Sequence, residues 1–263
     1  MIKKLELLDL ININMEKFEG SKDEIKDQVS KILVNILEKS SKNEQLLKED
    51  ISFLYETRFN TGWFGLTLNE PINKVYGLLD EQQKKDLERL LSKRDIKSDL
   101  SVLTGFPREQ ISTTNDEAVS GGIKYHYGDL SFAGTRKLVE GLKLPETVNG
   151  TLNFWSIIKT DGLEGVELPK IVGGDLVLSN LDSAKGLKLP ERIGGTLYLA
   201  EHKSAEGVEF PKIVDGSIDL VGLRSIKGLK LPEHVGGVVD FRLPKADIEE
   251  LKKQYPNLKI TNG

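Results

Sequence analysis

The second half of the chain repeats a motif of the form G-L-x-L-P, and this repeat constrains the fold more than any other feature. Successive prolines of the motif are 24, 21, 21 and 21 residues apart: Pro145, Pro169, Pro190, Pro211 and Pro232. A period in the twenties is typical of solenoid proteins, in which each unit buries its apolar face only by stacking on its neighbours. The spacing therefore predicts a solenoid.

Each repeat holds two short segments in which apolar and polar residues alternate, the pattern of a β-strand. The first segment predicts two inward-facing columns: Leu130, Leu152, Leu176, Leu197, Ile218 and Val239, and then Phe132, Phe154, Leu178, Leu199, Leu220 and Phe241. The second segment is the L-x-L that precedes each proline, such as Leu142 and Leu144 before Pro145. We expect six coils of two strands each, with a protruding loop between Phe154 and Gly165.

The charged residues near each proline change sign from one repeat to the next. Three columns alternate in this way: Lys143, Glu167, Lys188, Glu209 and Lys230; Glu146, Lys170, Glu191, Lys212 and Glu233; and Glu164, Lys185, Glu206 and Lys227. In stacked coils equivalent residues lie about 4.8 Å apart. Opposite charges at that spacing stabilise by roughly 0.2–1 kcal/mol, and like charges destabilise. The alternation predicts in-register stacking, although inheritance from a duplicated two-coil unit explains it equally well; in either case the columns are scaffold.

Over residues 128–243 the repeat resembles the leucine-rich-repeat class of solenoids. The matching positions lie in the first strand and just after it: Leu176, Leu178 and Leu181 of "LVLSNL", and Ile218, Leu220 and Leu223. The chain departs from that class because the leucine three residues before the strand is missing, a Gly-Gly pair stands near it, and no asparagine ladder occurs. These departures favour a β-solenoid with a second strand on its back over a helix-backed horseshoe. The resemblance implies a scaffold that binds other macromolecules, and it brings no catalytic residues.

The first half of the chain has a helical pattern, and only five of the 25 glycines precede residue 118. Ser21 and Glu24 form a capping-box signature, and the apolar residues behind them predict a helix over 22–40. We expect further helices over 44–57, from about Pro71, and after Asp80. A short strand is expected in residues 5–13, and residues 92–122 are expected to be a connection with at most one helical turn.

The expected fold class is α+β, with a mainly α-helical domain over residues 1–120. A leucine-rich-repeat-like β-solenoid of about six coils follows over residues 121–263. Residues 245–263 have helical spacing at Ile248 and Leu251 and are expected to cap the solenoid, because terminal repeats need a cover for their open apolar end.

Composition excludes several classes of function. The net charge of −4 gives no electrostatic footprint for direct nucleic acid binding. The absence of cysteine excludes disulfides and thiolate chemistry. The N-terminus is a weak signal peptide because Glu6 and Asp9 interrupt its apolar run, and no stretch approaches the roughly 20 apolar residues of a transmembrane helix. We expect a soluble, cytoplasmic protein without a membrane partner, with delivery into another cell left open.

Catalytic signatures are missing as well. The sequence has no P-loop, no dinucleotide-binding glycine motif, no H-E-x-x-H and no nucleophile elbow. The three histidines, His126, His202 and His234, are too scattered for a metal site. His202 takes a position held by leucine in adjacent coils, and we interpret it as a partly exposed turn residue. We expect no catalytic residue, no metal and no cofactor.

The outward positions of the first strand vary most and are the best candidates for recognition. They form one column: Ser131, Asn153, Val177, Tyr198, Asp219 and Asp240. Asp219 and Asp240 have like charges, so they either form an acidic spot for a basic group or are solvated and partly neutralised by Arg224 or Arg242. The predicted binding residues are Asn153, Trp155, Tyr198, Asp219 and Asp240, and the expected partner is another protein.

The leading hypothesis is a non-enzymatic interaction protein, with an effector or an inhibitor as possible roles. The alternative is a catalytic or toxin-like activity in the helical half, with a polar cleft near Arg58, Trp63 or Arg108 and perturbed carboxylates. Carbohydrate binding through Trp155 and Tyr198 is a further alternative. The sequence does not determine the oligomeric state.

Overall fold

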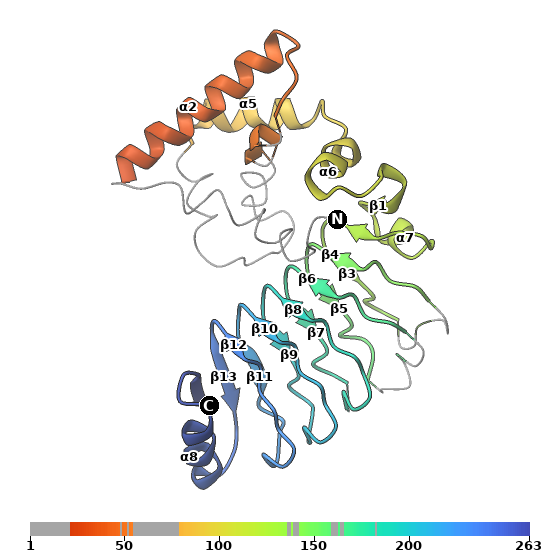
Figure 1. The fold of residues 1–263 in the computed structure, drawn as a ribbon, viewed down its shortest axis with the longest axis vertical. Helices are drawn as coiled ribbons and strands as arrows, with labels where there is room; N and C mark the ends of the chain where they lie inside the picture. Colours follow the sequence, from red (N-terminus) through yellow and green to blue (C-terminus); the bar gives the residue numbers. More distant parts are fainter. Residues whose placement is uncertain are drawn as a thin grey trace. The chain divides into compact units, whose positions relative to one another are not determined.

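The computed structural model describes residues 22–47, 49–51, 53–54, 79–135, 138, 142–158, 163, 166–181 and 183–263. The chain divides into two compact units, Met1–Arg108 and Glu109–Gly263. The described part of the first unit is helical, and the second unit is a parallel β-solenoid of about six turns (Figure 1). The boundary predicted at residue 120 lies further along the chain than this division.

Two of the predicted helices lie in the described part of the first unit. Helix α2 spans Lys22–Ser41 and buries Val29, Leu33 and Ile36. Helix α5 spans Glu81–Leu91 and begins at a capping box, in which the Asp80 carboxylate accepts from the Gln83 amide at 2.8 Å. Residues 49–51 and 53–54 are also helical, whereas 44–47 are not. The expectations for residues 5–13, for Ser21 and for a helix beginning near Pro71 lie outside the described residues.

Helix α6, Ile96–Thr104, was not predicted. It buries Leu100 and the carboxylate of Asp99, and Arg94 satisfies that carboxylate with two guanidinium hydrogen bonds, one of them 2.6 Å long. Gly105 ends the helix with a φ of 75°, a left-handed conformation that suits glycine. The expectation of at most one helical turn was wrong because a buried ion pair replaces part of the apolar periodicity on which it rested.

The solenoid consists of two parallel sheets of seven strands each, and each complete coil contributes one strand to each sheet. The strands of the first, here sheet A, are in order β1 Ile111–Ser112, β2 Tyr125–His126, β4 Thr147–Val148, β6 Ile171–Val172, β8 Arg192–Ile193, β10 Ile213–Val214 and β12 His234–Val235. The strands of the second, sheet B, are β3 Leu130–Ser131, β5 Leu152–Asn153, β7 Leu176–Val177, β9 Leu197–Tyr198, β11 Ile218–Leu220, β13 Val238–Phe241 and β14 Lys259–Asn262. No α-helix occurs among the described residues of the coils between α7, Asn115–Ala118, and α8, Lys245–Gln254.

The first predicted strand is confirmed, and the second is displaced. Sheet B pairs Leu130 with Leu152 and continues in the predicted register to Val239. Sheet A instead follows each proline: the L-x-L segments before the prolines make only isolated bridges, Lys143 with Glu167 and Lys188 with Glu209. Proline has no amide to donate, so a ladder does not run through it. The leucines of these segments still pack against the core.

One apolar core runs through the solenoid between the two sheets. Phe154 and Phe241 are among its largest fully buried side chains, and the ring of Phe132 stacks on that of Phe154 with centroids 5.1 Å apart. At the C-terminal end, β14 extends sheet B, and α8 adds the buried side chains of Ile248 and Leu251 to the core. The predicted capping helix is therefore present.

Candidate functional site

The column of outward positions predicted from the sequence lies on the outer face of sheet B. Its members pair in register from Ser131 through Asn153, Val177, Tyr198 and Asp219 to Asp240, and β14 adds Thr261. Their side chains are partly exposed apart from that of Thr261, which is exposed. Neighbouring strands are about 4.8 Å apart, so the column offers a row of regularly spaced side chains of varied chemistry.

Several of these side chains also shape the turn that follows their own strand. The Asn153 Oδ1 atom accepts from the Trp155 amide at 2.8 Å, and the Asp219 Oδ1 atom accepts from the Val221 amide at 3.1 Å. Ser131 does the same for Ala133 at 3.3 Å. Side chains that bond a backbone amide two residues later are typical of turns, so part of the polar character of this column has a structural cause.

Asp219 and Asp240 are direct neighbours on β11 and β13, as predicted. Within residues 183–263, all of which are described, no ion pair joins either carboxylate to Arg224 or Arg242. The Asp240 carboxylate instead accepts from the Thr261 hydroxyl at 2.8 Å. Neither arginine therefore pairs directly with these carboxylates, and β14 provides a neutral hydrogen-bond donor at Asp240.

Tyr198 lies in the middle of the column. Burial raises the pKa of its phenol, and the negative charges of Asp175 and Asp219 raise it further, against a hydrogen bond with the Thr196 side chain. The phenol therefore stays protonated well above neutral pH and remains a hydrogen-bond donor.

Trp155 lies two residues after the column, on the turn that follows β5, and its side chain is 56% exposed. Besides the bond from its amide to Asn153, its carbonyl accepts from the Asn180 side chain at 2.9 Å. The next residue, Ser156, accepts from the Gly134 amide at 2.7 Å. Side chains and amides from three successive coils thus hold the backbone of an exposed tryptophan, and Ile158 beside it is 58% exposed.

A second polar column, which the sequence analysis missed, connects the coils at the corner before sheet B. The Asp129 carboxylate accepts from the Thr151 amide, and the Asp175 carboxylate accepts from the Thr196 amide, both at 2.7 Å. The intervening hydroxyls of Thr151, Thr196 and Ser217 continue the column at 3.1–3.4 Å. We call these five residues the corner ladder. The recurrence of Asp, Thr or Ser immediately after the corner glycine in five successive coils was the signal available in the sequence.

Burial raises the pKa of both corner-ladder carboxyls, Asp129 and Asp175, above the ordinary value. The amide that each carboxylate binds opposes this effect, and the charge of Asp175 adds to it at Asp129. Neither carboxyl has a recorded ion-pair partner in the described residues, so both act as hydrogen-bond acceptors within the scaffold.

The alternating charge columns stack as predicted where they are described. Glu146 forms ion pairs with Lys124 at 2.6 Å and with Lys170 at 3.6 Å, and Lys227 lies 3.7 Å from Glu206. The isolated bridges bring Lys143 beside Glu167 and Lys188 beside Glu209. Glu164 lies outside the described residues.

The three histidines lie apart, and the described residues contain no group of three or more potential metal ligands. His234 is exposed on β12, as expected. His202 is buried, with 2% exposure, because its ring takes the core position that Leu181 and Leu223 fill in the adjacent coils. The interpretation of His202 as a partly exposed turn residue was wrong.

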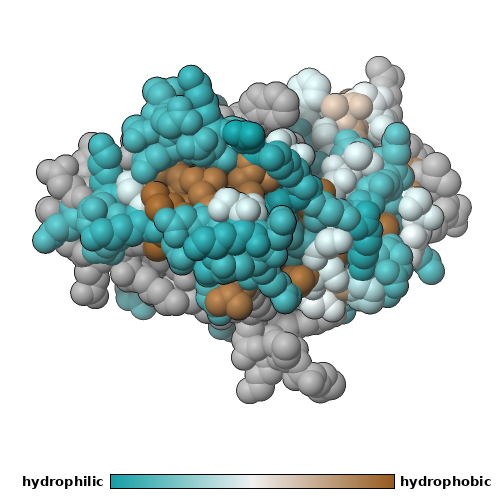
Figure 2. Space-filling model, turned by 90° about the horizontal axis from the view of Figure 1, so that it is seen from above, coloured by the Kyte–Doolittle hydropathy of each residue, from teal (hydrophilic) through white to brown (hydrophobic). Residues whose placement is uncertain are grey.

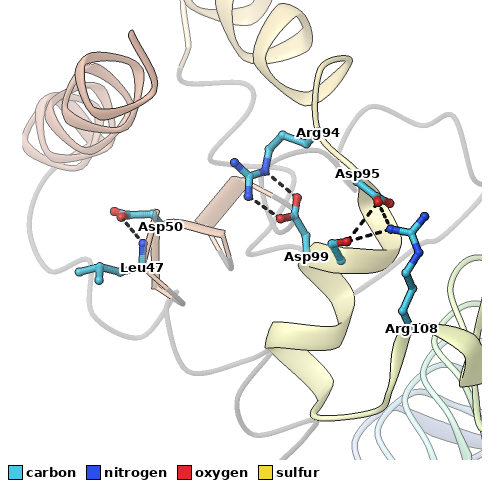
Figure 3. Close-up of polar contacts among 7 residues, drawn as sticks. Leu47, Asp50, Arg94, Asp95, Asp99 and Arg108 are labelled. Atoms are coloured by element: carbon cyan, nitrogen blue, oxygen red, sulfur yellow. Dashed lines mark hydrogen bonds and ion pairs between the residues drawn. The ribbon is translucent and has the colours of Figure 1, made fainter. Parts of the chain in front are cut away.

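Charged groups of the helical unit form local ion pairs (Figure 3). Arg94 binds Asp99, and Arg108 binds Asp95 together with the Ser98 hydroxyl, the latter at 2.9 Å. The Asp50 carboxylate accepts from the Leu47 amide and from the Lys39 ammonium, at 2.9 and 2.8 Å. These contacts hold the ends of helices. Arg58 and Trp63, the other residues of the predicted catalytic alternative, lie outside the described residues.

Hydrophobic atoms are exposed between hydrophilic side chains on the side of the molecule seen in Figure 2. In the helical unit the exposed large apolar side chains of the described residues are those of Val34, Leu47 and Val102. None of the helices in the described ranges combines the length and apolar character needed to cross a membrane.

No protein-family model matches the chain, and neither a curated protein nor a solved structure is significantly similar to it.

Proposed function

We propose that the protein is a non-enzymatic binding protein whose solenoid, built of leucine-rich-type repeats, presents the outer face of sheet B to another protein. The contact residues are Asn153, Trp155, Tyr198, Asp219 and Asp240. The observation that carries this proposal is the in-register outer column together with the exposed Trp155 beside it.

The chemistry of this face suits a protein partner. Tryptophan and tyrosine are enriched among the residues that dominate binding energy at protein interfaces. The turn bonds of Trp155 and Asn153 keep the backbone in one conformation, which lowers the entropy cost of binding. Asp219 and Asp240 add negative charge at one end of the face, so the partner is expected to place a basic side chain there.

The proposal is tested by cross-linking the full-length protein in lysate of its source cells and comparing two double variants. Tyr198→Ala with Asp219→Lys removes a ring and reverses a charge on the face. His234→Ala with Glu250→Lys makes matched changes at exposed positions outside it. We expect the first variant to lose at least tenfold in the yield of a specific cross-linked partner, without a large shift in melting temperature, and the second to retain it. Equal yields from both variants would exclude this face.

A further inference from the structure

The first pair of strands in sheet A, β1 and β2, has polar side chains at an inward position that is apolar in every later coil. Ser112 on β1 pairs with His126 on β2, and both side chains are buried. The same inward column continues with Val148, Val172, Ile193, Val214 and Val235. A hydroxyl and an imidazole therefore replace two core side chains where the solenoid begins.

Both ring nitrogens of His126 have a partner. Nε2 lies 3.0 Å from the carbonyl oxygen of Asp129, and Nδ1 lies 2.9 Å from the Ser112 hydroxyl. A carbonyl only accepts, so Nε2 carries the proton and Nδ1 accepts from Ser112. A second proton on Nδ1 would reverse the Ser112 hydroxyl and place a full positive charge in the interior.

The surroundings offer this charge little compensation. The hydrogen bond to the Asp129 carbonyl favours the imidazolium, and the charge of Glu117, on α7, favours it to a smaller extent. The Asp129 carboxylate is directed to the Thr151 amide, and Glu146, just before β4, is paired with Lys124 and Lys170. β1 and β4 contribute no charged side chain, because their residues are Ile111, Ser112, Thr147 and Val148. β2 contributes the neutral phenol of Tyr125. Burial dominates, and it lowers the pKa of His126.

The strand held by this pair lies at an edge of sheet A. β1 is the edge strand at the N-terminal end of the solenoid, has two residues and pairs only with β2. Around the pair, the Lys124 amide donates to the Gln110 carbonyl and the Tyr127 amide donates to the Ser112 carbonyl, both at 2.9 Å. Edge elements open at a lower free-energy cost than the whole domain. We propose that Ser112 and His126 form an acid-sensitive latch, in which protonation of His126 releases β1 and α7 from the first coil while the later coils stay stacked.

The latch is tested by amide hydrogen exchange of the full chain between pH 7.5 and 5.5, corrected for the intrinsic pH dependence of exchange. A histidine whose folded-state pKa is lowered stabilises the closed form above its unfolded-state pKa, about 6.5, and this stability is lost as the pH falls below that value. We expect the opening constant at Lys124 and Tyr127 to rise by up to about tenfold per pH unit below pH 6.5. The Gly194 and Asp215 amides, which donate to the preceding coil, should change much less.

Two variants remove the titrating group. Ser112→Val with His126→Val gives the first pair of strands the apolar composition of the later coils, and His126→Gln keeps a neutral donor and acceptor in case the double variant does not fold. Both should abolish the extra pH dependence, whereas His234→Gln, at an exposed histidine, should retain it. The latch is refuted if the wild-type amides of Lys124 and Tyr127 follow those of the later coils, or if the His126 variants keep the acid response.

Discussion

Single side chains at the corner before sheet B join each coil to the next. Asp129 and Asp175 each offer one carboxylate oxygen to an amide of the following coil. The hydroxyls of Thr151, Thr196 and Ser217 accept from amides of the following coil at the same corner. Carboxylates and hydroxyls thus connect successive coils here without an asparagine ladder.

Substitutions of Asp175 test how much its hydrogen bond to the Thr196 amide contributes to stability. Asp175→Asn keeps the Oδ1 acceptor and removes a partly buried charge, so we expect a free energy of unfolding at pH 7 equal to or above that of the wild type. Asp175→Ala leaves the Thr196 amide without its acceptor and should cost about 1–3 kcal/mol. Urea unfolding monitored by circular dichroism measures both effects.

The pH dependence of the free energy of unfolding tests whether the buried charge of Asp175 causes this difference. The folded-state pKa of Asp175 is raised, so its ionisation destabilises the folded chain above that pKa, and this penalty disappears as the pH falls below the unfolded-state value of about 3.9. Any advantage of Asp175→Asn should therefore shrink on acidification. An advantage that grows as the pH falls would contradict this explanation.

The strands are so short that their pairing depends on the stack as a whole. Most have two residues, and the charge columns beside them contribute to the register by opposing lysine and glutamate. Each such contact is modest in energy, and contacts of this kind join neighbouring coils at several points along the described part of the stack. The register of a two-residue strand is therefore specified by its neighbours on both sides.

Lys188→Glu tests this contribution. The change replaces a lysine that lies between Glu167 and Glu209 by a third glutamate, so two opposite pairs become two like pairs. We expect a loss of about 1 kcal/mol at low salt, and a smaller loss in 1 M NaCl because salt screens exposed charges. Lys188→Gln is the control and should lose about half as much. Equal stability of the two variants at low salt would show that the alternation is inherited and does not stabilise the stack.

The apolar core of the solenoid is built only from residues between 118 and 260, all of which belong to the second unit. We therefore expect a fragment of residues 109–263 to fold by itself and to unfold cooperatively on heating. A fragment of residues 122–263 lacks β1 and α7 and leaves the edge of β2 and the His126 ring uncovered, so it should melt at a lower temperature. Differential scanning calorimetry of both fragments measures this, and identical melting temperatures would mean that β1 and α7 add nothing to the solenoid.

Much of the solenoid could be predicted from the sequence because every coil repeats the same alternation of inward apolar and outward polar residues. Leu152 and Phe154 identify the sheet B strand and its inward face by their alternation alone, and the proline spacing predicts the number of coils. The outer column from Asn153 to Asp240 followed directly, since residues between inward positions must face outward. The predicted α2 and the Asp80 cap of α5 rested on equally local signals.

The tertiary structure decided features that depend on contacts between coils or within the helical unit. Sheet A follows the prolines, and the glycines after its strands let the backbones of adjacent coils approach closely: a Cβ on Gly194 would lie 2.2 Å from the Gly173 carbonyl oxygen. The corner ladder, the burial of His202 and the polar pair of Ser112 and His126 likewise arise from neighbours 14 or more residues away. Local pattern determines which face of a strand is apolar, whereas packing against the next coil determines where the strand lies and which polar groups its interior accepts.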